Sequence, residues 1–119
     1  MKDIVDVLRE KGCDIDGAMG RMLGDSDFML RCMRISLTQS EFEQLGEALG
    51  RKDAKEAFEY AHALKGVSGN VGLTPVYDAV VKLVEPLRNG NAEGLEDAYR
   101  ELLEKRAEMK EILDGEDRQ

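Results

Sequence analysis

The stretch AHALKGVSGNVGLTP, residues 61–75, contains the end of one predicted helix and the start of the next. Gly72 is a C-terminal stop, because glycine readily takes the left-handed conformation that ends many helices. Thr74 followed by Pro75 is a start signal, since proline at the first helical position gives up an N–H that has no partner there. Two helices joined by so short a turn are antiparallel neighbours, so this stretch predicts a helical hairpin.

Both helices of the predicted hairpin have recognisable boundaries and an apolar face. The first opens at Asp53, where a capping residue is followed by Glu56, and is expected to run to about Val71. Pro86 interrupts the last turn of the second helix and predicts a kink or an early end near Val84. The apolar face of the second helix consists of Val76, Val80, Leu83 and Leu87.

Two short segments come first in the chain. A marginal amphipathic stretch contains Ile4, Val5 and Leu8. Asp14 is then a candidate cap for a short helix that Gly24 ends. The apolar positions of that short helix are Ile15, Ala18, Met19 and Met22.

A longer helical run begins at Asp25 or Ser26 and closes at Gly50. Inside it, residues 40–43 match a capping box, with serine at the cap and glutamate three residues later. The run is therefore either two helices or one helix bent near Thr38. Its predicted core residues, three or four positions apart, are Phe28, Cys32, Ile35, Phe42, Leu45 and Leu49.

The last part of the chain predicts one more helix. Residues 88–91 form a turn, Asn91 caps the helix, and residues 114–119 are expected to be a frayed tail that leaves the core at residues 14–113. Four amphipathic helices joined by short turns predict an all-α fold, an antiparallel four-helix bundle with an additional short N-terminal helix, as a single domain of residues 1–119. The inward positions of the final helix, near heptad spacing, are Leu95, Ala98, Leu102, Arg106, Met109 and Leu113.

Composition excludes several classes of protein. The net charge of -8 and the pI of about 4.7 argue against a nucleic-acid partner, which needs a concentrated basic face. No apolar run approaches the length of a membrane span, and the first residues lack the apolar stretch of a signal peptide, so a cytoplasmic protein without membrane attachment is expected. Cys13 and Cys32 are isolated and the chain has one histidine, so we expect reduced thiols, with Cys32 in the core, and no metal site.

That one histidine, His62, is predicted to face solvent. At about 100° per residue, Ala57, Ala61 and Leu64 fall with other apolar positions inside an arc of roughly 120°, the width of a core-facing stripe. His62 points almost opposite to the centre of this arc. Its neighbours on the outer face, three, four or seven residues away, are Lys55, Phe58, Glu59, Lys65, Gly66 and Gly69.

Gly66 and Gly69 are costly choices on this face. Each glycine destabilises a helix interior by roughly 1 kcal/mol relative to alanine. Gly66 would let the backbone of another protein approach His62, and Lys65 would place a mobile ammonium near a phosphoryl oxygen. The alternatives are that His62 is an ordinary surface residue, that the glycines permit close helix packing, and that Phe58 folds over the edge of the bundle instead of meeting a partner.

Residues 61–73 resemble the signature of histidine-containing phosphotransfer (HPt) domains, in which His-x-Leu-Lys-Gly is followed by small residues and Asn-x-Gly. The order of the predicted helices over most of the chain is also similar to that family, which is a helical bundle with an exposed histidine. The resemblance implies that His62 is phosphorylated, that Lys65 assists the phosphoryl group and that Gly66 permits docking. Lys55, Phe58, Glu59 and Gly69 are further candidate docking residues.

The same resemblance implies a phosphorelay intermediate that carries a phosphoryl group between receiver-domain aspartates, without enzymatic machinery of its own. Its partners would be response-regulator receiver domains, with a hybrid histidine kinase as a further candidate, and the chain is expected to be a monomer. No cofactor is expected, because the receiver would supply Mg²⁺. The alternatives are a helical interaction module that is not phosphorylated and an enzyme with His62 as general base, which the lack of an accompanying acid or nucleophile disfavours.

One position departs from the family pattern. Counting from the hairpin turn, residues 82–85 face the level of His62. Many HPt domains place a glutamine or similar polar residue there to bond the imidazole. This chain has Val84 and Glu85, so Glu85 is the candidate for orienting His62.

Overall fold

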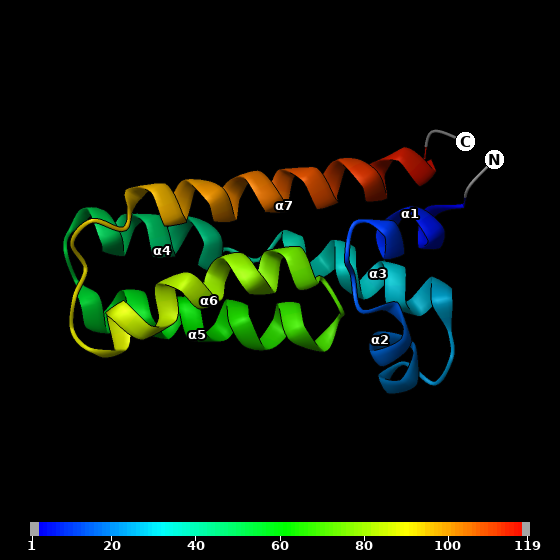
Figure 1. Ribbon diagram of the computed structural model, residues 1–119, viewed down its shortest axis with the longest axis horizontal. Helices are drawn as coiled ribbons and strands as arrows, with labels where there is room; N and C mark the ends of the chain where they lie inside the picture. Colours follow the sequence, from blue (N-terminus) through cyan, green and yellow to red (C-terminus); the bar gives the residue numbers. More distant parts are fainter. Residues whose placement is uncertain (1–2, 118–119) are drawn as a thin grey trace.

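The computed structural model describes residues 3–117, with side chains up to residue 115, and this part of the chain is helical without strands. The predicted all-α fold class is confirmed. Within this range no helix is both long enough and apolar enough to cross a membrane. The helices are α1 (Ile4–Glu10), α2 (Ile15–Arg21), α3 (Ser26–Leu37), α4 (Glu41–Gly50), α5 (Ala54–Asn70), α6 (Thr74–Arg88) and α7 (Glu96–Asp117) (Figure 1).

Helices α4 to α7 form the predicted antiparallel four-helix bundle. Helix α4 packs against α5, α5 against α6, and α6 against α7. Helix α3 continues the line of α4 along the C-terminal half of α7, and α1 and α2 lie at the same end of the molecule (Figure 1). Two short helices, α1 and α2, therefore precede α3 and the bundle, where one was predicted, because the stretch that begins at Ile4 is also helical.

Aspartate side chains cap four of the helices at their N-termini, and the first is Asp3, which accepts the backbone N–H of Asp6 in α1 at 2.9 Å. Asp14, Asp25 and Asp53 each accept a hydrogen bond, 3.0 Å long, from the backbone N–H three residues later in α2, α3 and α5. Each bond satisfies a donor that a helix start leaves unpaired. The sequence prediction was correct at these three starts.

The capping box predicted at residues 40–43 is wrong, although the helical run is indeed interrupted there. Ser40 has helical backbone angles, φ -64° and ψ -17°, and makes no side-chain capping bond. Its hydroxyl instead contacts the side chain of Gln44 at 3.2 Å. Because α3 ends at Leu37 and α4 begins at Glu41, the run is two helices.

Helix α6 continues through Pro86 to Arg88, so the early end expected near Val84 does not occur. Proline removes one hydrogen bond of the helix, the bond from residue 86 to the carbonyl of residue 82. Leu87 lies directly after it and is 2% exposed. Burial of this side chain stabilises the last turn and offsets the lost bond.

The final helix also differs from its predicted bounds. The Asn91 side chain accepts the backbone N–H of Glu93, which stabilises the turn, and α7 starts only at Glu96. Residues 114–117 are helical rather than frayed, and residues 118–119 of the predicted tail lie outside the described residues.

Helix α3 buries a different face from the predicted one. Phe28 and Ile35 are 44% and 53% exposed, and Cys32 is only half-buried. The sequence offers two apolar stripes on this helix, and hydrophobic spacing alone does not distinguish them. The stripe that enters the core is Met29, Leu30, Met33 and Leu37.

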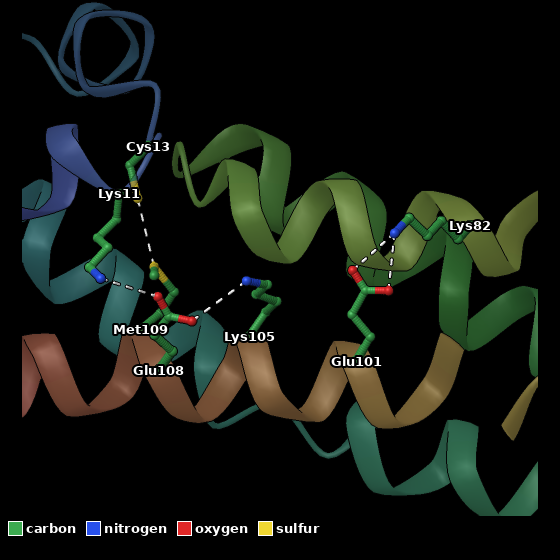
Figure 2. A network of polar contacts seen from close by, with 7 residues as sticks. All are labelled: Lys11, Cys13, Lys82, Glu101, Lys105, Glu108 and Met109. Carbon is green, nitrogen blue, oxygen red and sulfur yellow. Dashed lines mark hydrogen bonds and ion pairs between the residues drawn. The ribbon is translucent and has the colours of Figure 1, made fainter. Parts of the chain in front are cut away.

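The connection between α1 and α2 is tied to both the hairpin turn and α7. The backbone N–H of Asp14 donates to the carbonyl of Gly72 at 3.0 Å and contacts Oγ1 of Thr74 at 3.1 Å. The thiol of the buried Cys13 contacts the sulfur of Met109 at 3.8 Å (Figure 2). Burial raises the pKa of the Cys13 thiol to about 11, so this free thiol stays protonated at neutral pH.

Ion pairs join α7 to its neighbours at the surface. Nζ of Lys82 on α6 lies 2.9 and 3.0 Å from the two carboxylate oxygens of Glu101 (Figure 2). Lys11 reaches Glu108 at 3.7 Å. Exposed pairs of this kind contribute at most about 1 kcal/mol each, so the buried apolar side chains hold the helices together.

The contact between α2 and the hairpin turn makes a testable prediction about Gly72. Gly72 has φ +79°, and a Cβ there would lie 2.6 Å from the Asp14 carbonyl oxygen and 2.9 Å from Cβ of Ala18. Gly90 has a similar φ of +82° but open space around it. We expect Gly90→Ala to lower the free energy of unfolding by about 1 kcal/mol, the cost of the left-handed conformation alone. Gly72→Ala should lower it by about 3 kcal/mol, because the clash is added.

Urea unfolding followed by circular dichroism measures both variants. Equal losses of stability would show that α2 can move away from the turn and that this contact does not constrain the fold.

Candidate functional site

His62 lies near the middle of α5 and is exposed to solvent. On the opposite side of the helix, Ala57 and Ala61 are fully buried and Leu64 is 1% exposed. Ser68 is also buried on that side, and its hydroxyl donates to the carbonyl of Leu64 at 2.7 Å. The predicted core stripe is therefore correct, and its burial sets the outward direction of His62.

A shallow surface hollow of about 410 Å³ contains the exposed face of His62. Three helices line this His62 hollow: α2, α5 and α6. The structure thus brings together four of the residues that the sequence singled out and adds others. The lining residues are Arg21, His62, Lys65, Gly66, Gly69, Asn70 and Tyr77.

The charge of the hollow is opposite to that of the whole chain. Its lining includes the cations Arg21 and Lys65 and no carboxylate, although the chain carries a net charge of -8. Among the described residues, none forms an ion pair or hydrogen bond with the ammonium of Lys65. An anionic group beside His62 would therefore meet positive charge.

The two glycines of the hollow have different surroundings. A Cβ on Gly66 would meet nothing within 4 Å, so no neighbour in the described chain requires glycine at this position. A Cβ on Gly69 would lie 3.2 and 3.3 Å from Cδ2 and Cε2 of Tyr77 on α6. Close packing against Tyr77 therefore accounts for Gly69, whereas Gly66 leaves the surface beside His62 open.

His62 contacts an aromatic ring rather than a polar group. The rings of His62 and Phe58 are stacked, with centroids 5.6 Å apart and planes inclined by 20°. Within residues 3–117 the imidazole makes no hydrogen bond. Glu85, the predicted orienting residue, instead forms an ion pair with Arg88.

The remaining predicted docking residues lie outside the hollow. Lys55 and Glu59 are exposed on α5 towards its N-terminal end, and Phe58 is half-buried beside His62. None of the three lines the hollow. They extend the exposed face of α5 beyond it.

Sequence reasoning did not find Arg21. Its guanidinium donates from Nε to the carbonyl of Asn70 at 2.8 Å and from an NH₂ group to that of Gly69 at 3.0 Å. It thereby caps the C-terminus of α5 from α2 and brings a second cation to the hollow. Neither Arg21 nor Tyr77 has a local sequence signal for this role, because their contacts with α5 depend on how the helices pack.

Comparison with protein families matches residues 30–118 to the Hpt domain. The matched part contains α4 to α7 with His62, whereas α1 and α2 lie before it. Comparisons with curated proteins and with solved structures give no match.

The family match covers most of the chain and agrees with the helical bundle on which His62 is exposed. Hpt domains are phosphocarrier modules that interact with receiver domains and kinases, and they are not enzymes in themselves. The chain therefore belongs to the Hpt domain family, the phosphotransfer modules of two-component signalling systems.

Proposed function

We propose that the chain is a phosphorelay intermediate that carries a phosphoryl group on His62 from the aspartate of one receiver domain to that of a second. The observation that carries this proposal is the exposed position of His62 in a cationic hollow. Imidazole is a nucleophile that is partly neutral near neutral pH. No second histidine is present in the chain to share the role.

The proposed transfer is a displacement at phosphorus. A ring nitrogen of neutral His62 attacks the phosphorus of the receiver's aspartyl phosphate, and an N–P bond forms while the P–O bond to the aspartate breaks. The aspartate leaves as a carboxylate, and the other ring nitrogen gives its proton to solvent. The carboxylate of the second receiver then attacks, the N–P bond breaks, and the imidazole takes up a proton again.

In the proposed step, two cations of the hollow stabilise the negative charge of the phosphoryl group. The ammonium of Lys65, one turn after His62, has no partner among the described residues and can contact an equatorial phosphoryl oxygen. Arg21, on α2, adds positive charge to the lining of the hollow. Mg²⁺ would come with the receiver, because the described residues contain no group of three His, Cys, Asp or Glu side chains able to hold a metal ion.

Gly66 would allow the receiver to come close to His62. The phosphorus must come close to the imidazole nitrogen, so the receiver's backbone must lie near α5. The open space over Gly66 supports this role, since every other residue type would place a side chain there.

The first prediction of the proposed function is that His62 is phosphorylated. Wild-type protein incubated with a ³²P-phosphorylated receiver domain should gain label that is lost in acid and kept in alkali, as expected for an N–P bond. His62→Gln should gain none, because glutamine keeps the volume and polarity but lacks the nucleophile.

Circular dichroism of His62→Gln controls for folding. Absence of label on the wild type with a panel of receivers would contradict the phosphocarrier proposal. Tight binding of a receiver without label would favour the non-phosphorylated interaction module.

A second prediction separates the effect of Gly66 on stability from its effect on transfer. Gly66→Gln should raise the free energy of unfolding by about 0.5 kcal/mol, because glutamine favours helix and meets no clash. The same variant should slow transfer from the receiver about tenfold, because the new side chain holds the phosphorus away from His62.

Gly115→Gln is the matched control. Gly115 also lies in a helix with open space around it, on α7 and away from the hollow. The Gly115→Gln variant should be more stable than the wild type and should transfer the phosphoryl group at the wild-type rate. A Gly66→Gln protein that transfers at the wild-type rate would remove Gly66 from the docking surface.

A further inference from the structure

We infer that Phe58 is a positioning residue that orients the imidazole of His62 by ring stacking, since no described residue forms a hydrogen bond with this imidazole. The inference rests on the proposed function, because it assigns Phe58 a part in phosphoryl transfer. It differs from the docking role that the sequence suggested for the same residue.

The stacking geometry is that of an attractive aromatic pair. The centroid separation of 5.6 Å and the inclination of 20° correspond to offset stacking. Phe58 lies one turn before His62 on α5, where side chains four residues apart meet. Because Phe58 also packs against the buried core, it is a fixed surface against which the exposed imidazole rests.

Arg88 on helix α6 also contacts the ring of Phe58. The guanidinium carbon of Arg88 lies 5.4 Å from the centroid of the Phe58 ring, within the range of a cation–π contact. Glu85 holds Arg88 through an ion pair one turn earlier on the same helix. Glu85 therefore acts on His62 only through Arg88 and Phe58, instead of by the direct bond that the sequence suggested.

Orientation by stacking has a chemical consequence for the imidazole. A hydrogen bond between the imidazole and a glutamine or glutamate side chain would occupy one ring nitrogen and select one tautomer. Stacking holds the plane of the ring and occupies neither nitrogen, so one is free to attack phosphorus while the other releases its proton to solvent. An exposed aromatic pair favours one ring orientation by a few-fold to about tenfold, and the transfer rate should depend on Phe58 to that extent.

The first experiment measures stacking without any receiver. In NMR spectra of the full chain, the carbon-bound ring protons of His62 should be displaced by the ring current of Phe58. Phe58→Leu should move them to the positions of an unstacked histidine, and Phe58→Tyr should restore them. Unchanged His62 signals in Phe58→Leu would overturn the inference.

The second experiment separates positioning from docking. With a phosphorylated receiver domain as donor, Phe58→Leu should lower the maximal transfer rate three- to tenfold without raising the half-saturating receiver concentration, and Phe58→Tyr should restore the rate. Arg88→Gln should give a smaller loss, because an exposed cation–π contact is weaker than the ring stack. A raised half-saturating concentration at an unchanged maximal rate would instead assign Phe58 to docking and overturn the inference.

The two experiments also separate this inference from the proposed function. If no receiver labels wild-type His62, the phosphocarrier proposal fails, and the NMR measurement still decides whether Phe58 orients the imidazole. Circular dichroism and urea unfolding of Phe58→Leu verify that the variant is folded before either readout is interpreted.

Discussion

The packing of the narrow apolar stripe of α5 between α4 and α6 is the constraint on which the site depends. Half of its buried residues are alanines, Ala57 and Ala61, and both are fully buried. Small side chains allow the neighbouring helices to approach closely, and a close-packed interface leaves little freedom for rotation about the helix axis. Because α5 has little freedom to rotate, burial of its opposite face holds His62 on the solvent side.

The N-terminal segment with α2 packs against the C-terminal end of α5, although it precedes the part of the chain that matches the family. Asp14 bonds the turn after α5 through its backbone, and Arg21 bonds the last carbonyls of α5. These contacts satisfy backbone groups that a helix end otherwise leaves to water. They also bring the cation Arg21 into the His62 hollow, so a segment that caps the end of α5 also contributes to the charge of the site.

The site combines a tightly packed helix with an exposed histidine, which is the nucleophile under the proposed function. Lys65 has no ionic partner in the described chain, and His62 is stacked on Phe58 without a hydrogen bond. A carrier that must accept a group and release it again benefits from such a site, because strong binding of either form would slow the other transfer. In the proposed relay, the receiver would supply the metal and most of the electrostatic stabilisation in the transition state.

Three features of the protein could be predicted from its sequence: the all-α class, the hairpin of α5 and α6, and the exposure of His62 beside Lys65 and Gly66. Each of these depends on local rules: aspartate caps, glycine and proline signals, and the angular period of a helix. Four other features depend on how the helices pack: which apolar stripe of α3 is buried, whether α6 continues past Pro86, which glycine is required by packing, and whether Glu85 reaches His62. The neighbours that decide these points, such as Tyr77 against Gly69 and Arg88 beside Glu85, come together through helix packing, and local sequence patterns do not encode the distance between side chains on different helices.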